Sequence, residues 1–311
     1  KMIDIVNLVH PKPTQKNSLA LSKLVKNELV STDTWEAELS KAGQNGKDDE
    51  ETMSLKGEVW ERLLKEGKLG YFALLRNLRN IYTQAPPTVL DEVVKQLTDK
   101  NKIKNSLVLP FRFLSAYAEL EKLLPSVTPK GIKFEEDTTT GLGKILKAID
   151  DAMVLSVENL PILNGRTAIL SDNSASMTGR GVGFGRFSDT QTSDIANLFS
   201  VLYWLKASNT YVGLFGDRMI APTLDRTKGI MHNFKLIDAE KEKCGGSTEN
   251  GIYDFFEEAI RNKTVIDTIV VFSDCQIGSG CVWYGTGYQR AGGNFMRLFN
   301  DYKKISPNVR V

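Results

Sequence analysis

Oxygen-bearing side chains recur in three short segments of the second half of the chain, in a pattern that suits a divalent cation. DNSAS (172–176) places one carboxylate and two hydroxyls at the end of the apolar run 166–172. GGST (245–248) supplies a hydroxyl before a helix-like stretch, and SD (273–274) supplies a second carboxylate at the end of the apolar run 265–273. These hard oxygen ligands suit Mg²⁺ or Mn²⁺ better than zinc. The candidate ligands are Asp172, Ser174, Ser176, Thr248 and Asp274.

The elements around these segments alternate between strand-like and helix-like patterns. Short apolar runs predict strands over 166–172, 210–216 and 265–273, and helical patterns over 191–207, 249–261 and 291–304 lie between or after them. Such alternation predicts a parallel sheet covered on both faces, in which the carboxyl ends of the strands share one edge. The alternative, that Asp172 and Ser176 merely cap a helix or turn, fits an isolated motif. Three segments in this order favour the cation site.

The first half of the chain has a different character, because it is poor in glycine and rich in amphipathic stretches. Of the 25 glycines, 8 lie before residue 165 and 17 after it. We therefore divide the chain into a helical segment, 1–164, and an α/β segment, 165–311. Helices joined by short loops favour an all-α array such as an α-solenoid. The expected helical stretches are 16–31, 57–67, 70–82, 88–98, 110–124 and 142–155, with polar breaks at 41–52 and 125–141.

Composition narrows the class of protein. The 311 residues carry 40 basic and 38 acidic side chains with a hydrophobic fraction of 41 %, which is typical of a globular protein with two domains or one large one. No apolar run is long enough to cross a membrane. A net charge of +2 excludes a uniformly basic nucleic-acid coat but not a local basic patch. Three cysteines and no signal peptide favour a reducing, cytoplasmic setting.

A first group of candidate RNA-binding residues surrounds two prolines near the start of the chain. His10, Lys12 and Lys16 lie around Pro11 and Pro13, which would fix a loop before a helix. Such a group can contact phosphate or stack on a base. Judged without a family resemblance, His10 fits a solvated loop histidine better.

A second group consists of basic residues on expected helices. Arg76 and Arg79 belong to ALLRNLRN (73–80) and suit a pore-facing surface, a solvated helix face or ion pairs equally well. Lys102, Lys104 and Arg112 form a further modest basic group near a helix start. Near-neutral chains bind RNA only if such residues gather on one surface.

The three oxygen-bearing segments resemble a known site. ILSDNSASM, GGST and VVFSD are similar to the three loops of the metal-ion-dependent adhesion site of von Willebrand factor A domains, with Asn173 at a position where an aliphatic residue is usual. The resemblance implies that the five candidate ligands hold a cation, with Mg²⁺ as the first choice and Mn²⁺ or Ca²⁺ as alternatives. It also implies an open coordination position that an acidic partner group completes, and binding rather than catalysis.

The helical half makes the resemblance more specific. LVHPKP (8–13), VWERLL (59–64), ALLRNLRNI (73–81) and LPFRFLSAY (109–117) resemble the TROVE module of the Ro autoantigen family, in which helices also lead into DVSASM. The resemblance implies HEAT-like helical repeats followed by an α/β, Rossmann-like von Willebrand factor A domain. It also implies binding of small non-coding Y RNAs, in which His10 takes part, and of single-stranded ends of misfolded RNAs.

The family further implies the setting and partners of the chain. We expect a scaffold that is no enzyme and is present in one copy per ribonucleoprotein. We also expect a cytoplasmic location, and an exoribonuclease is a candidate partner. Compared with the family, we expect 1–164 to correspond to the C-terminal part of the module and 165–311 to lack a final strand and helix. The alternative function is a protein-interaction or adhesion module that captures an acidic partner through the cation.

Other chemical signals in the sequence are weaker. GRGVGFG (179–185) lacks the spacing of a dinucleotide-binding or phosphate-binding loop, so we expect a long loop beside the cation site. Cys275 and Cys281 have no second pair or histidine for zinc. The two histidines, His10 and His232, neighbour no nucleophile motif, which disfavours a triad hydrolase. Metal-dependent RNA hydrolysis is disfavoured because no general base is evident.

Overall fold

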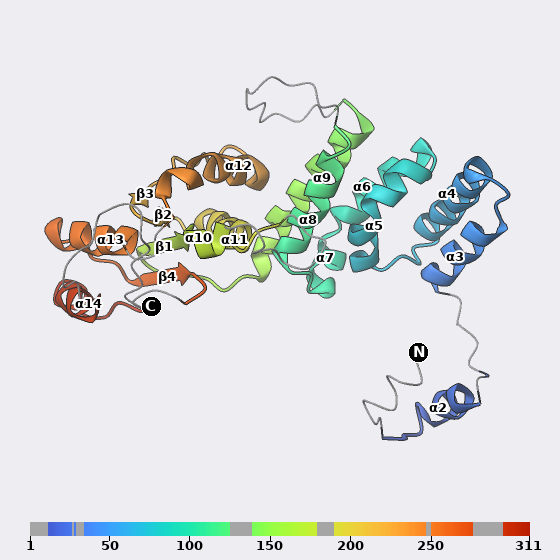
Figure 1. The fold of residues 1–311 in the computed structure, drawn as a ribbon, viewed down its shortest axis with the longest axis horizontal. Helices are drawn as coiled ribbons and strands as arrows, with labels where there is room; N and C mark the ends of the chain where they lie inside the picture. The colour runs from blue at the N-terminus through green and yellow to red at the C-terminus, as the bar shows by residue number, and fades with distance from the viewer. Residues whose placement is uncertain are drawn as a thin grey trace. The chain divides into compact units, whose positions relative to one another are not determined.

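The structure is a computed structural model that describes residues 12–26, 28, 34–124, 139–178, 190–246, 250–275 and 295–311. A helical region comes first and a mixed α/β region follows it, as the sequence predicts (Figure 1). The described residues divide into two compact units. The first contains the chain up to Leu69 with Gln84–Pro86, and the second contains Gly70–Thr83 and Pro87–Val311. Within the described residues, no helix is both long and apolar enough to span a bilayer.

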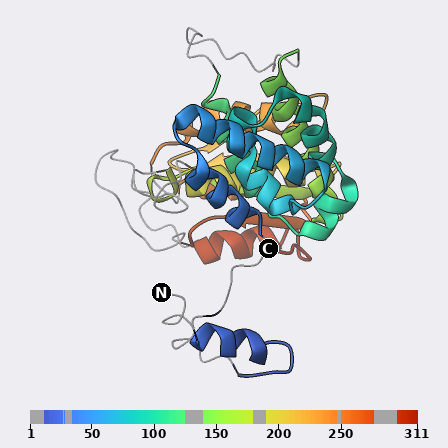
Figure 2. The ribbon, with the colours of Figure 1, turned by 90° about the vertical axis from the view of Figure 1, so that its right-hand side faces the viewer.

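The first unit contains α2 (Ser18–Val25), α3 (Trp35–Asn45) and α4 (Asp49–Lys65). The last two pack side by side, which both views show (Figures 1 and 2). Trp60 is buried between them, with its ring centroid 6.1 Å from that of Trp35 and its indole N–H donating to Gln84 Oε1 at 2.9 Å. The predicted break between helices at 41–52 is therefore wrong over most of its length, because α3 ends at Asn45 and α4 begins at Asp49.

Helix α9 buries most of its apolar residues in the helical part of the second unit. Helices α6, α7 and α8 all pack against it. Pro110 occupies the first turn of α8, where its missing N–H costs nothing. The side chains of Asp99 and Thr140 cap α7 and α9. In order, these elements are α5 (Tyr71–Gln84), η1 (Pro87–Val89), α6 (Leu90–Leu97), α7 (Lys100–Ser106), α8 (Pro110–Glu121), α9 (Gly141–Ser156) and η2 (Val157–Asn159).

The sheet of the second unit has the strand order β3-β2-β1-β4. Strand β1 runs parallel to both neighbours, with Ser171 opposite Leu214 on one side and Phe272 on the other. All residues of β1 are buried, as expected for a central parallel strand. After β4, Arg310 forms an isolated parallel bridge with Thr268. The strands are β1 (Thr167–Asp172), β2 (Thr210–Phe215), β3 (Met219–Ile220) and β4 (Thr268–Phe272).

The prediction of an all-parallel sheet is wrong at one edge, because β3 pairs antiparallel with β2. Only residues 216–218 separate the two strands. Such a short connection can form a hairpin, whereas a parallel crossover needs a dozen residues or more. The sheet is therefore mixed.

Helices cover both faces of this sheet. Helix α11 packs against β1 and β2, whereas Ala168 and Leu170 of β1 share an apolar core with α13 and α14. Residues 168 and 170 point away from α11 because side chains alternate along a strand. The helices of this region are α10 (Ala175–Thr178), α11 (Thr192–Lys206), α12 (Ile230–Lys241), η3 (Glu242–Cys244), α13 (Asn250–Arg261) and α14 (Phe295–Lys303).

The helices after residue 69 and the sheet belong to one unit, and Asp150 of α9 is one of the residues that join them. Its Oδ1 accepts a hydrogen bond of 2.9 Å from the backbone N–H of Met231, in the first turn of α12. Burial raises the pKa of this carboxyl, although hydrogen bonds from Met231 and Ile230 oppose the rise. Gly229 permits this approach, because a Cβ there would overlap the Asp150 carboxylate.

This contact predicts a coupled pair of stability effects. Asp150→Ala removes a buried acceptor at a helix N-terminus and is expected to lower the free energy of unfolding by about 1–3 kcal/mol. Gly229→Ala should destabilise the parent chain by a similar amount, but the Asp150→Ala chain far less, because the clash is gone. Urea unfolding of the two single variants and the double variant measures this coupling. Strictly additive changes in the free energy of unfolding would contradict it.

Candidate functional site

The carboxylate of Asp172 lies at the carboxyl end of β1 and is fully buried. Its Oδ1 accepts a hydrogen bond of 2.9 Å from the backbone N–H of Ser174, and its Oδ2 accepts one of 2.7 Å from the hydroxyl of Ser273. Burial raises the pKa of this carboxyl, the hydrogen bonds from Ser174 and Ser273 oppose the rise, and the negative charge of Asp274 adds to it. Two of the three predicted loops therefore meet at this carboxylate.

Two hydroxyls lie next to each other in the first loop. The Oγ atoms of Ser174 and Ser176 are 3.2 Å apart, and Ser174 is buried whereas Ser176 is partly exposed. Short helix α10 brings them together, since the backbone N–H of Met177 and Thr178 both donate to the carbonyl of Ser174. The structure therefore places two candidate ligands side by side, beside the loop that holds Asp172.

The remaining predicted loop, GGST (245–248), also reaches this edge of the sheet. The backbone N–H of Ala175 donates to the carbonyl of Gly246 at 3.0 Å, which anchors the start of that loop to the first one. The predicted ligand Thr248, with Ser247, lies outside the described residues. Asp274 is exposed, and its charge acts on Asp172. The three loops therefore converge as predicted, whereas the position of Thr248 stays a prediction.

The donor set at this edge fits a hard divalent cation. It combines a buried carboxylate, two adjacent hydroxyls and a second, exposed carboxylate, all of them oxygen ligands. Among the described residues, no group of three His, Cys, Asp or Glu side chains comes close enough to bind a metal. The sequence did not identify Ser273 as a partner of Asp172, although Ser273 directly precedes the candidate ligand Asp274.

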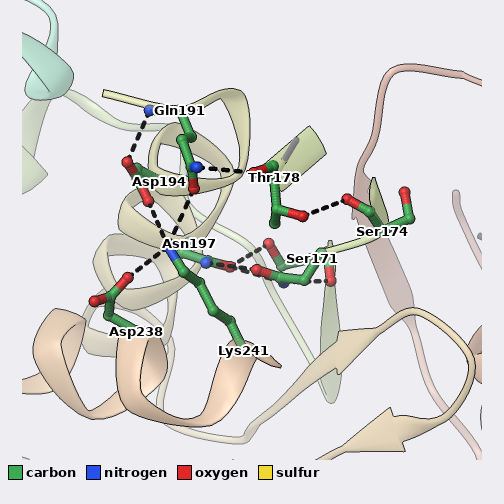
Figure 3. A network of polar contacts seen from close by, with 9 residues as sticks. Ser171, Ser174, Thr178, Gln191, Asp194, Asn197, Asp238 and Lys241 are labelled. Carbon is green, nitrogen blue, oxygen red and sulfur yellow. Dashed lines mark hydrogen bonds and ion pairs between the residues drawn. The ribbon is translucent and has the colours of Figure 1, made fainter. Parts of the chain in front are cut away.

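A network of polar contacts ties the first loop to α11 (Figure 3). Gln191, at the start of α11, donates from Nε2 to the carbonyl of Thr178 at 2.8 Å, and the hydroxyl of Thr178 donates to the carbonyl of Ser174 at 2.9 Å. Lys241 of α12 lies 3.1 Å from Asp194 and 2.6 Å from Asp238. Burial lowers the pKa of Lys241, but these two carboxylates outweigh burial and raise it.

The predicted basic residues of α5 and α8 line one groove, which we call the arginine groove. It has a volume of about 720 Å³, and its lining includes Phe72, Arg76, Arg79, Arg112 and Glu119. Positions 72, 76 and 79 follow one another at helical spacing on the exposed face of α5. The structure therefore brings together Arg76, Arg79 and Arg112, although Arg76 and Arg112 are 36 positions apart in the sequence.

The guanidinium of Arg112 is held by aromatic rings. Its Cζ lies 5.6 Å from the ring centroid of Phe72 and 4.9 Å from that of Phe111. Arg79 forms an ion pair of 3.0 Å with Glu119. Within the described part of the chain, neither Arg76 nor Arg112 forms an ion pair, so their N–H groups can reach a phosphate. Phe72, which is 45 % exposed, is the residue of this groove that the sequence reasoning missed.

The remaining basic candidates lie elsewhere. His10 is outside the described residues, and Lys12 and Lys16 are exposed just before α2, in the first unit. Lys102 donates to Gln96 Oε1 at 3.1 Å, and neither it nor Lys104 belongs to the described lining of the arginine groove. The predicted grouping of these two lysines with Arg112 is therefore not seen in that groove. The glycine-rich loop 179–185 and Cys281 also lie outside the described residues.

Part of the chain is similar to a known protein domain. Residues 22–141 match the model of the TROVE domain. Telomerase protein component 1 of Mus musculus is 35 % identical over 113 residues, which are 36 % of this chain and 4 % of that protein. The Rattus norvegicus protein of the same name is 34 % identical over 113 residues, with the same coverage. The chain thus spans only about 4 % of these curated relatives.

The fold is similar to that of a solved structure over nearly the whole chain. The crystal structure of the Deinococcus radiodurans Ro (RSR) protein matches with a TM-score of 0.55 and 18 % sequence identity. The match covers 98 % of this chain and 61 % of that one. At this identity the likeness concerns the fold.

Proposed function

We propose that this chain is an RNA-binding component of a ribonucleoprotein, because residues 22–141 match the model of the TROVE domain and the fold is similar to that of a Ro protein. The observation that carries the proposal is the arginine groove. Three guanidinium groups and one carboxylate line it, on a chain whose net charge is only +2. A local positive surface of this kind attracts the phosphate backbone, while the rest of the chain stays near neutral.

The groove suits unpaired RNA better than a duplex. Arg76 and Arg112 offer donors for phosphates, and the exposed ring of Phe72 offers a face for a base to stack on. Bases are free to stack in this way only in single strands, loops and ends. We therefore propose single-stranded ends of structured RNA as ligands of the groove, in line with a role in quality control of misfolded RNA.

The resemblance to the Ro family supports further partners. We propose that a small non-coding, Y RNA-like molecule binds through the loop of His10, Lys12 and Lys16, and that the particle contains one copy of the chain. An exoribonuclease is a candidate partner of such a cytoplasmic particle. In this proposal the chain acts as a scaffold and not as an enzyme.

The cation site supports a second function, the capture of a protein partner. We propose that the α/β region is a von Willebrand factor A domain in which Asp172, Ser174, Ser176, Thr248 and Asp274 hold Mg²⁺, with Mn²⁺ or Ca²⁺ as alternatives. The buried carboxylate and the paired hydroxyls at the strand ends support this proposal. A cation there would offer its open position to an acidic group of the partner.

The stacking role of Phe72 gives a direct test of the RNA proposal. Phe72→Ala is expected to weaken binding of a single-stranded RNA by roughly 1–3 kcal/mol, the range for one base on an aromatic ring, and to leave duplex RNA binding nearly unchanged. Fluorescence anisotropy with labelled single-stranded and duplex oligonucleotides measures both.

Val154→Ala is the matched control for this variant, because Val154 is 46 % exposed and lies on α9, away from the groove lining. An equal loss of single-stranded binding in both variants would count against stacking at Phe72. Binding by the parent chain that does not weaken as salt rises would count against the RNA proposal itself.

A further inference from the structure

A buried pair of amides joins the first cation loop to α11. Asn173, which lies between Asp172 and Ser174, is 3 % exposed, and Asn197 of α11 is 1 % exposed. Asn197 Nδ2 donates to Asn173 Oδ1 at 2.8 Å, and Asn173 Nδ2 donates to Asn197 Oδ1 at 3.1 Å. The two side chains therefore exchange hydrogen bonds in both directions.

Ser171 completes this buried network. Its hydroxyl donates to Asn197 Oδ1 at 2.7 Å, and its carbonyl accepts from Asn173 Nδ2 at 3.1 Å (Figure 3). A buried amide without such partners destabilises the fold, because its hydrogen bonds to water are lost and none replaces them. The side chain of Asn173 is thus restricted to one arrangement, in which α11 and the end of β1 hold it.

The same residue is held through its backbone. The N–H of Asn173 donates to the carbonyl of Phe215, at the end of β2, at 2.8 Å. Farther along the segment, the side chain of Gln191, the N-cap residue of α11, donates to the carbonyl of Thr178. Helix α11 therefore holds the segment 173–178 near its start and at its end, and the candidate ligands Ser174 and Ser176 lie between the two attachments.

We propose that the Asn173–Asn197 pair positions the cation-binding loop, so that Asp172, Ser174 and Ser176 keep the arrangement in which they bind the ion. This inference rests on the proposed cation site. Neither amide is a ligand. Each acts through the backbone that carries the ligands, as groups around metal sites commonly do.

Mn²⁺ affinity of the full chain tests this role, measured by electron paramagnetic resonance of free Mn²⁺. Asn173→Val and Asn197→Val are each expected to weaken Mn²⁺ binding about ten-fold, the lower end of the range for residues that support metal ligands. The double variant should bind Mn²⁺ much more tightly than the product of the two single losses of affinity predicts, because neither amide is left without its partner. If a valine variant does not fold, Mn²⁺ affinity is measured with Asn197→Ser instead, which places a small polar side chain in the same pocket.

Thermal unfolding without the cation separates positioning from general stability. Ser200→Ala is the matched control, since Ser200 is buried on α11 and its hydroxyl donates to the carbonyl of Ala196 in the same helix. Folded variants that bind Mn²⁺ as the parent does, or losses that simply multiply, would overturn the positioning role and leave the cation site standing. A parent chain that binds no Mn²⁺ would overturn the cation site and this inference together.

Discussion

Asp172→Asn is expected to weaken Mn²⁺ or Mg²⁺ binding by roughly 100-fold or more, because it removes the negative charge of the one fully buried carboxylate in the donor set. Asparagine keeps the shape of the side chain, and its Oδ1 can still accept from the backbone N–H of Ser174. Its NH₂ group takes the place of Oδ2 and can donate to the hydroxyl oxygen of Ser273. The fold should therefore survive. RNA binding should stay within about two-fold of the parent, since the arginine groove involves none of these residues.

The control for this variant is Asp267→Asn, at the opposite end of β4. Asp267 accepts a hydrogen bond of 2.7 Å from the backbone N–H of Arg166 and is remote from the carboxyl ends of the strands. The same change of charge there should leave cation affinity intact. Isothermal titration with Mg²⁺, together with Mn²⁺ resonance, measures both variants. Parent-like affinity in Asp172→Asn would show that the predicted site does not bind the ion.

The second large effect concerns RNA. Arg76→Ala with Arg112→Ala removes the two groove arginines that form no ion pair within the described chain, and is expected to weaken RNA binding about 10- to 100-fold at low salt. Loss of two phosphate contacts should also reduce the slope of log affinity against log salt by about 1 to 2. Anisotropy titrations at several salt concentrations measure the affinity and the slope.

Two further variants show whether the effect belongs to the groove. Arg166→Ala with Arg261→Ala removes the same charge from exposed positions outside the groove, so the salt slope should stay unchanged. Glu119→Gln removes the carboxylate that pairs with Arg79 and should tighten RNA binding. Lys122 and Arg79 lower the pKa of this carboxyl, so its charge is present at neutral pH. Equal losses in both double-arginine variants would point to bulk charge instead of the groove.

Much of the α/β region could be predicted because its pattern is local. The apolar runs at 166–172, 210–216 and 265–273 coincide with β1, β2 and β4 within a few residues. Strand β3 was missed because two half-exposed residues after a tight turn carry little periodic signal. Helix α12 was not predicted either, since its start depends on Asp150, a residue about 80 positions earlier.

The candidate sites were predictable to different degrees. Asp172 and Ser174 could be assigned because their motif follows a buried strand, whose end must lie at the sheet edge. The arginine groove could not, because Arg112 meets Phe72 only through the packing of two helices that are distant in sequence. The role of Asn173 depends in the same way on Asn197, which no local motif connects to it.

Photocrosslinking locates bound RNA on the chain and so shows whether RNA lies in the arginine groove. A single-stranded RNA with 4-thiouridine would be bound to the full chain and irradiated, and the crosslinked peptides would be identified by mass spectrometry. RNA in the groove is expected to crosslink to the peptides that carry Phe72 and Arg112, and the Arg76→Ala and Arg112→Ala double variant is expected to lose these crosslinks. Crosslinks confined to peptides outside α5 and α8, unchanged in that variant, would contradict it.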